Sequence, residues 1–226
     1  MRIAFLLFPN VTQLDLTGPA QVLARLGGNS RLDLVWKTLD PVPTDAGFSI
    51  LPTATFDDVA SADILCVPGG VGVNRVIADE AAMDWVARIG GDAGWVTSVC
   101  TGSLILGAAG LLRGHRATSH WAWREKLAAF GAIPVAERVV VDRNRVTGGG
   151  VTAGIDFGLT LTSLIRGEDH ARMVQLSLEY DPAPPFDAGS PERAGEALVN
   201  AFEQRMEKLA PGRHEELRDL AKQRGF

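Results

Sequence analysis

The sequence is poor in cysteine, in positive charge and in long hydrophobic runs. Among its 226 residues are two cysteines, Cys66 and Cys100, and 22 basic residues are outnumbered by 27 acidic ones. A pI of about 5.4 argues against binding to nucleic acid, because the phosphate backbone requires a basic surface. No apolar stretch approaches the ~18 residues of a membrane span, so we expect no membrane partner either.

The N-terminal segment MRIAFLLFPNVTQLDL lacks the features of a secretion signal. Its apolar run is interrupted by Pro9, Asn10 and Asp15, and no clean small-residue cleavage site follows. We interpret this segment as a first β-strand. Without a secretion signal, the two cysteines are expected to be free thiols in a reducing compartment, which predicts a cytoplasmic protein.

Motifs for metal and nucleotide binding are also missing. The four histidines do not stand at metal-ligand spacings from either cysteine, so we expect no metal site. Neither a GxxxxGK(S/T) phosphate loop nor a GxGxxG fingerprint occurs. The sequence therefore predicts a protein without a cofactor.

What the chain does contain is a regular alternation of short apolar strands and helical patterns. The expected strands cover residues 3–8, 33–38, 63–67, 96–99, 116–119, 138–141 and 145–147. The expected helices cover residues 12–26, 80–89, 102–112, 121–130 and 152–164. Residues 40–58, with their prolines and glycine, suit loops or a short hairpin. The alternation predicts an α/β fold with a mostly parallel sheet and helices on both of its faces.

Three short motifs rich in glycine or bearing a cysteine follow predicted strands. They are Pro68-Gly69-Gly70, Cys100-Thr101-Gly102 and Gly148-Gly149-Gly150. Because ligands of such sheets bind outside the carboxyl ends of the strands, we expect the three motifs to converge on one site. The N–H groups of Gly69 and Gly70 are candidate donors to a developing negative charge, and a plain tight turn is the alternative.

Cys100 is the candidate nucleophile. It stands in WVTSVCTGSL, where a strand ends and a helix begins, and such a turn presents a side chain at the sheet edge. The helix N-terminus is expected to lower the pKa of the thiol and so to favour the thiolate. Thr101 either orients water or substrate, or caps the helix. Cys66, in the middle of a strand, is interpreted as structural.

Asp15 and His120 are the candidate acid–base residues. Asp15 lies between two leucines just after the first strand, so it either caps the next helix or occupies a site where burial raises its pKa. The residues alone leave both interpretations open. His120 lies in an apolar setting and is either a base for the thiol or a packed side chain. The other three histidines lie among charged residues and are expected to be exposed.

The C-terminal part begins with a proline-rich extended segment, residues 181–191. Ser190-Pro191 fits the N-cap and first position of a helix that runs to about Leu209, and a last helix follows Pro211-Gly212. We divide the chain into a catalytic domain, residues 1–190, and a C-terminal helical extension, residues 191–226, packed on the same domain. The extension carries an apolar stripe that is either packing or a dimer face, formed by Leu198, Phe202, Met206 and Leu209.

Taken in order, these motifs resemble a known family. The segments QLDLTGP, VPGG, TSVCTGS, RATSHW and TGGGVTAGIDF are similar to those of the PfpI-like branch of the class I glutamine amidotransferase-like superfamily, and within it to the isocyanide hydratases. The resemblance covers about residues 1–190. It implies a flavodoxin-like three-layer sandwich with a nucleophile elbow, and a homodimer. It also implies a hydro-lyase that converts an isocyanide and water to an N-substituted formamide.

The resemblance also assigns roles to residues. By motif, Cys100 is the nucleophile, Asp15 the acidic partner of the thiol, and Thr101 a neighbour needed for activity. The expected substrate-binding residues are Gly69, Gly70, His120 and Val151. Thr101 stands where many superfamily members have a histidine, which argues against peptidase or glutaminase chemistry. We expect a thioimidate intermediate, with Asp15 acting first as acid and then as base, which requires a pKa nearer neutrality than that of a free aspartate.

Three other functions compete with this prediction. The first is a glyoxalase- or deglycase-like activity on α-oxoaldehydes, although such family members generally carry Glu where Asp15 stands. The second is a redox sensor, because an exposed cysteine of low pKa oxidises readily. The third is the sensor half of a transcription regulator, but residues 191–226 are too few for two helix-turn-helix units and carry no basic stripe.

Overall fold

A seven-stranded sheet forms the centre of the protein in the computed structural model, which describes residues 1–226. The strand order is β10-β11-β7-β6-β1-β2-β5. All neighbours pair in parallel except the edge strand β10, which forms an antiparallel hairpin with β11. The strands are β1 (Arg2–Leu6), β2 (Arg31–Trp36), β5 (Ala54–Thr55), β6 (Ile64–Val67), β7 (Trp95–Val99), β10 (Val139–Asp142) and β11 (Arg145–Gly148). The predicted parallel α/β sheet is confirmed.

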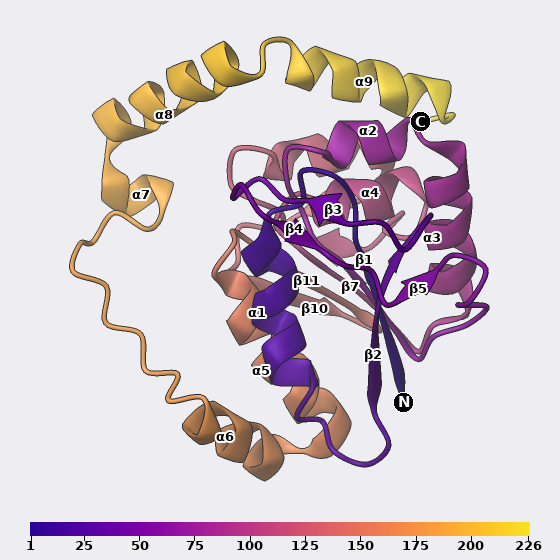
Figure 1. The fold of residues 1–226 in the computed structure, drawn as a ribbon. Helices are drawn as coiled ribbons and strands as arrows, with labels where there is room; N and C mark the ends of the chain where they lie inside the picture. The colour runs from indigo at the N-terminus through magenta and orange to yellow at the C-terminus, as the bar shows by residue number, and fades with distance from the viewer.

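The inner strands are continuous apolar runs because both faces of the sheet are covered. In β1 the side chains from Ile3 to Leu6 have no exposed surface, and β6 is buried along its whole length. Helices α1 and α5 pack together on one face, while α2, α3, α4 and η1 cover the other (Figure 1). This is the flavodoxin-like three-layer arrangement expected from the sequence.

The helices of the body largely follow the predicted ranges. They are α1 (Gln13–Leu23), α2 (Val73–Ile77), α3 (Glu80–Asp92), α4 (Gly102–Ala108), the 3₁₀ helix η1 (Arg124–Phe130), α5 (Ala153–Arg166) and α6 (Glu168–Ser177). Gly131 ends η1 with a φ of 72°. Two helices are not evident from the sequence: α2 is too short to show a period, and α6 buries only Ala171 and Val174, so it has almost no apolar face to detect.

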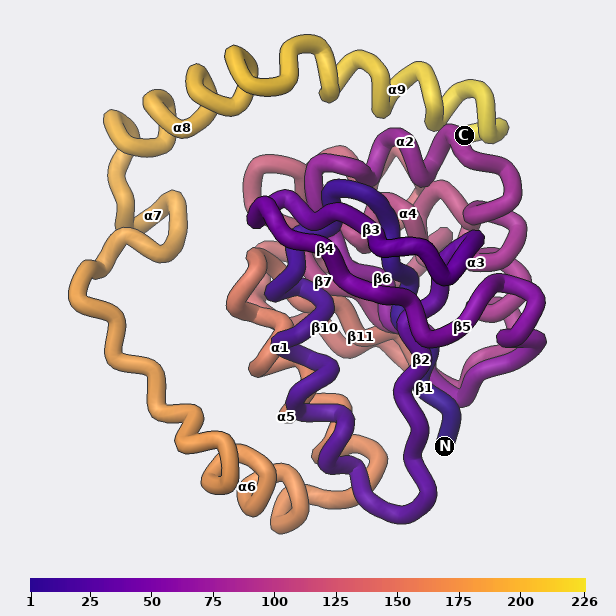
Figure 2. The backbone as a smooth tube through the Cα atoms, viewed as in Figure 1, coloured from indigo at the N-terminus to yellow at the C-terminus, as the bar shows by residue number.

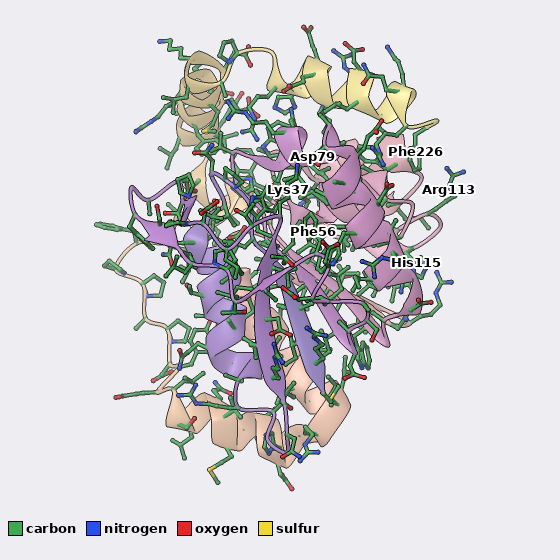
Figure 3. The ribbon with its side chains drawn as sticks, turned by 45° about the vertical axis from the view of Figure 1, so that its right-hand side comes forward. Lys37, Phe56, Asp79, Arg113, His115 and Phe226 are labelled. Atoms are coloured by element: carbon green, nitrogen blue, oxygen red, sulfur yellow. The ribbon has the colours of Figure 1, made fainter.

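Two small sheets flank the main one. Strands β3 (Val42–Pro43) and β4 (Ser49–Ile50) form the short hairpin expected for the proline-rich stretch. Strands β8 (Arg116–Ala117) and β9 (Ile133–Pro134) pair in parallel beside η1. An ion pair between Lys37 and Asp79, labelled in Figure 3, ties the chain after β2 to the N-cap of α3.

The C-terminal part leaves the body and returns to it. We call residues 181–212 the C-terminal arm; it contains an extended segment, α7 (Pro191–Ala194) and α8 (Glu196–Leu209), and α9 (Arg213–Gln223) follows it. Figures 1 and 2 show the arm arching from α6 around the body to α9, which lies over α2. The single helix predicted from residue 191 to 209 is wrong. Gly195, with φ 80° and ψ 157°, interrupts it, and the Ser190 side chain makes no capping bond.

The arm and α9 differ sharply in burial. Helices α7 and α8 contain no buried residue, whereas α9 buries Leu217, Leu220 and Ala221 against the body. The chain ends on Phe226, whose ring packs edge-on against Phe130. Arg113 lies 4.7 Å over the same ring (Figure 3). The C-terminal end is thus fastened to the body by buried side chains, whereas the arm contacts the body through Phe202, which packs on His120 and Trp121. None of the helices combines the length and the hydropathy that crossing a membrane requires.

Candidate active site

Cys100 occupies a strained turn at the carboxyl end of β7. Its φ of 56° lies in the left-handed region, which residues with a Cβ avoid at a cost of roughly 1–2 kcal/mol. Hydrogen bonds on both sides hold the turn: its N–H donates to the Gly148 carbonyl at 3.0 Å, and its carbonyl accepts from the Ser103 and Ser119 hydroxyls. The turn therefore has the geometry of a nucleophile elbow. Ser119 is not evident as a site residue from the sequence, because nothing in its neighbourhood marks a contact with Cys100.

Two glycines allow the turns after β6 and β7 to approach each other. A Cβ on Gly102 would lie 2.1 Å from the Val67 carbonyl oxygen. A Cβ on Gly69 would lie 2.6 Å from both the backbone N and the Oγ1 of Thr101, and 2.9 Å from Asp15 Oδ2. Together with the Gly148 contact, this confirms that the three predicted motifs converge on one site.

Asp15 points from the first turn of α1 into this site. Its side chain is 1% exposed, and Gly69 N–H donates to Oδ2 at 2.9 Å. The other oxygen, Oδ1, is buried without a hydrogen-bond partner, and the Cys100 thiol lies close enough for each group to shift the pKa of the other. Burial raises the pKa of Asp15 to about 7, although the Gly69 bond and the nearby thiol oppose this shift. The side chain does not cap α1, so the structure favours the second of the two interpretations that the residues alone leave open.

The pKa of the Cys100 thiol is raised well above its usual value, first by burial and then by the charge of Asp15. The expectation that the helix N-terminus would lower this pKa is therefore wrong. Helix α4 has seven residues, and the hydrogen bonds from Thr101 are outweighed by the loss of solvent. As the pair titrates, Asp15 loses its proton before the thiol does, so it can act as the base that receives the thiol proton.

The backbone N–H groups of Gly69 and Gly70 are already engaged. Gly69 N–H donates to Asp15, and Gly70 N–H donates to Thr101 Oγ1 at 3.1 Å. In this structure they orient Asp15 and Thr101, and their role toward a developing negative charge stays a prediction. The turn after β6 closes directly onto these two side chains. Thr101 does not cap α4 with its side chain; its hydroxyl instead accepts from Gly70 N–H and lies near enough to the Cys100 thiol to lower its pKa.

His120 is a packed side chain and makes no hydrogen bond to Cys100. Its Nδ1 accepts from Ala122 N–H at 3.3 Å, and its ring stacks against Trp121 and Phe202. Burial lowers its pKa. Of the two interpretations of His120, the structure therefore favours a packed side chain over a base for the thiol. With Val151 it lines a cavity of about 570 Å³, whose lining includes Ser119 but not Cys100.

Two of the other three histidines, His115 and His214, are less exposed than the sequence predicts. His115 is only 13% exposed and lies 3.4 Å from Asp142, and the ring of His214 stacks on Trp123 at 4.1 Å, so neither is freely exposed. The sequence does not reveal these contacts because the partners are distant in the chain. No group of three or more His, Cys, Asp or Glu side chains is arranged to hold a metal ion.

The fold and the elbow define the class of protein. The DJ-1/PfpI family model matches residues 1–164, and the chain belongs to this family. The isonitrile hydratase of Pseudomonas putida is 55% identical over 205 residues, which cover 91% of this chain and 90% of the relative.

Two further comparisons show how much of the chain the similarity covers. The crystal structure of a THiJ/PfpI family protein from Pseudomonas syringae has a TM-score of 0.90 and 45% identity, covering 100% of this chain and 90% of its own. The likeness thus extends through the C-terminal arm. An HTH-type transcriptional regulator of Pseudomonas aeruginosa is 34% identical over 78% of this chain, which spans only 48% of the regulator.

Proposed function

We propose that this protein is an isocyanide hydratase, which converts an isocyanide and water to an N-substituted formamide. The observation that carries the proposal is the buried pair of Asp15 and Cys100. It joins a nucleophile in a strained turn to a carboxyl group whose pKa is about 7. The 55% identity with the isonitrile hydratase of Pseudomonas putida supports the same reaction.

The first half of the reaction forms a covalent intermediate. Ionised Asp15 takes the proton of the Cys100 thiol as the sulfur attacks the terminal carbon of the isocyanide. Asp15 then gives that proton to the same carbon. The product is a thioimidate, Cys100-S–CH=N–R, and the thiol hydrogen has moved to carbon with no external acid. The hydroxyl of Thr101, which lowers the pKa of the neighbouring Cys100, stabilises the sulfur while it carries negative charge.

The second half releases the formamide. Water attacks the thioimidate carbon, and Asp15 accepts one of its protons as the C–O bond forms. Asp15 passes this proton to the nitrogen, the C–S bond breaks, and the thiolate leaves. The hydroxyl proton of the intermediate returns to the thiolate by way of Asp15 as the carbonyl of R–NH–CHO forms, so one isocyanide and one water yield one formamide. A carboxyl group with a pKa of about 7 suits both directions of proton transfer.

The alternatives fit the site less well. A redox sensor needs an accessible thiol of low pKa, whereas Cys100 is 6% exposed and its pKa is raised. An activity on α-oxoaldehydes remains the second candidate because the chain belongs to the DJ-1/PfpI family. Methylglyoxal consumption by the reduced protein measures it directly.

The test is a steady-state assay with a simple alkyl isocyanide, in which formamide production is followed by NMR. We expect turnover by the wild-type protein, and a mass increase on the Cys100 peptide equal to that of the isocyanide when the reaction is quenched in acid. A folded, reduced protein that consumes methylglyoxal but no isocyanide would contradict the proposal. The matched control is Cys66→Ala, which removes the other thiol.

We also propose a cytoplasmic homodimer in which the C-terminal arm contacts the second copy. Both thiols are free, and the arm exposes apolar side chains that a protein partner would cover. Phe186, Leu198 and Leu209 are 82%, 53% and 67% exposed. Light scattering should give twice the chain mass, and Leu198→Glu should weaken the dimer. A monomer mass that does not change with concentration would refute it.

A further inference from the structure

Helix α9 places a cation near the turns after β6 and β7 that form the candidate active site. Its first residue, Arg213, is half-buried between two parts of the body. The guanidinium donates to the Val71 carbonyl at 3.1 Å and lies 4.9 Å over the ring of Trp123. Val71 directly follows Gly69 and Gly70, whose N–H groups hold Asp15 and Thr101. Arg213 thus contacts the same turn that orients the reacting pair.

The charges that act on Arg213 are those of Glu216 and of the Cys100 thiolate. Glu216, one turn later on α9, receives a bond of 2.6 Å from the Asn74 amide, and the same amide donates to the Arg213 carbonyl. Burial lowers the pKa of Arg213, while the charges of Glu216 and of ionised Cys100 raise it. The attraction is mutual, so Arg213 stabilises the Cys100 thiolate. The charge of Asp15 acts on the thiol in the opposite sense.

We propose that Arg213 is a positioning residue of the active site: it holds the turn of residues 69–71 against Asp15 and Thr101 and places a positive charge beside that turn, where it favours the Cys100 thiolate. This inference deepens the proposed function and rests on it for the reaction, but not for the thiol chemistry. It also gives the C-terminal extension a role, because α9 is packed on the body where it delivers Arg213.

The experiment measures the pH dependence of Cys100 alkylation by iodoacetamide, quantified on the Cys100 peptide. Arg213→Met should raise the apparent pKa of this reaction by about 0.5–1 pH unit, which slows alkylation about three- to tenfold at a pH below that pKa. Arg213→Lys keeps the charge and should recover most of the rate. Formamide turnover should fall by a similar factor in Arg213→Met.

Two matched variants on the same helix separate charge from anchoring. Arg224 also fastens α9, donating to the carbonyls of Ala108 and Ile77, so Arg224→Met loosens the helix without removing the cation near the active site. Arg218 is 61% exposed and pairs only with Glu215, so Arg218→Met changes the net charge alone. Both should leave the alkylation profile within about twofold of wild type.

Each outcome separates one explanation from another. The role of Arg213 would be overturned if the Arg213→Met variant were alkylated like the wild type. It would also be overturned if Arg224→Met shifted the apparent pKa of alkylation as much as Arg213→Met does. If Arg213→Met strongly lowers the melting temperature, the alkylation rate of Arg213→Lys decides the question. A rate that is lost in Arg213→Lys too would mean that Arg213 has only a structural role. Alkylation requires no isocyanide. A shifted pH dependence of alkylation in a protein without hydratase activity would therefore contradict the proposed function but support the inference.

Discussion

The two cysteines of this protein lie on neighbouring strands and have opposite surroundings. Cys66 is in the middle of β6, accepts a hydrogen bond from the Thr97 hydroxyl at 3.0 Å, and has a pKa raised to about 12 by burial. Cys100 is also buried and its pKa is also raised, but its backbone is left-handed and its thiol meets the carboxyl group of Asp15. Burial alone therefore makes a thiol inert, and a base in contact with it makes it available for chemistry.

The largest effect is expected from replacing each of the two cysteines with alanine. Cys100→Ala should reduce formamide production to background, because no other side chain can form the thioimidate. Cys66→Ala should keep turnover within about twofold and lower the free energy of unfolding by about 1–2 kcal/mol through a small cavity. Equal losses of activity in the two variants, measured at equal folded fraction, would erase the distinction between the cysteines.

Removing the base should have the next largest effect. Asp15→Asn keeps the shape but cannot accept the thiol proton, so we expect turnover to fall by about 10²–10⁴. In the wild-type protein kcat/KM should rise with pH through about 7 as Asp15 ionises, and this limb should be absent from the residual activity of the variant. A variant with the wild-type pH profile would remove Asp15 from the mechanism.

The same substitution should change how stability depends on pH. The unfolded chain releases the Asp15 proton near the ordinary value of 3.8, whereas the folded protein holds it up to about pH 7. Stability from the neutral carboxyl group is therefore complete below pH 3.8 and is lost as pH rises through about 7, by on the order of 4 kcal/mol. Asp15→Asn should flatten this part of the urea-unfolding profile, while Asp40→Asn, an exposed carboxyl group, should leave it unchanged.

A methyl group on Gly102 should disturb the turns after β6 and β7 without touching either cysteine. Its Cβ would lie 2.1 Å from the Val67 carbonyl oxygen, so the two turns must move apart. We expect Gly102→Ala to lower the free energy of unfolding by about 3 kcal/mol and to reduce turnover. The control is Gly91→Ala in α3, where nothing lies within 4 Å and the helix should gain up to about 1 kcal/mol. Urea denaturation compares the two, and equal stabilities would contradict the close approach.

The smallest effect is expected at the inert cysteine. Thr97→Val removes the hydroxyl that bonds both Cys66 and the Leu65 carbonyl, in a residue with no exposed surface. Stability should fall by about 1 kcal/mol with unchanged turnover. Alkylation by iodoacetamide should remain confined to Cys100, as peptide mass spectrometry would show. Labelling of Cys66 in this variant would mean that the hydrogen bond, rather than burial, keeps it unreactive.

Much of the body could be predicted because its signals are local. The apolar runs in β1, β6 and β7, and the change to helical spacing after Cys100, each lie within a few residues. The same holds for the three motifs at the strand ends, whose meeting follows from the parallel sheet alone. Local signals failed where an element has little apolar surface, as in α6, or where a glycine breaks a helix, as at Gly195.

The sequence by itself determined which residues stand in the elbow, and its resemblance to a family assigned Asp15 to the same site as Cys100. Only the tertiary structure decided what these groups are chemically. The raised pKa values of Asp15 and Cys100, the engaged N–H groups of Gly69 and Gly70, the packing of His120 and the arrival of Arg213 all depend on loss of solvent and on partners from other elements. The physical reason is that desolvation and hydrogen bonding act over distances in space, which spacing along the chain does not encode.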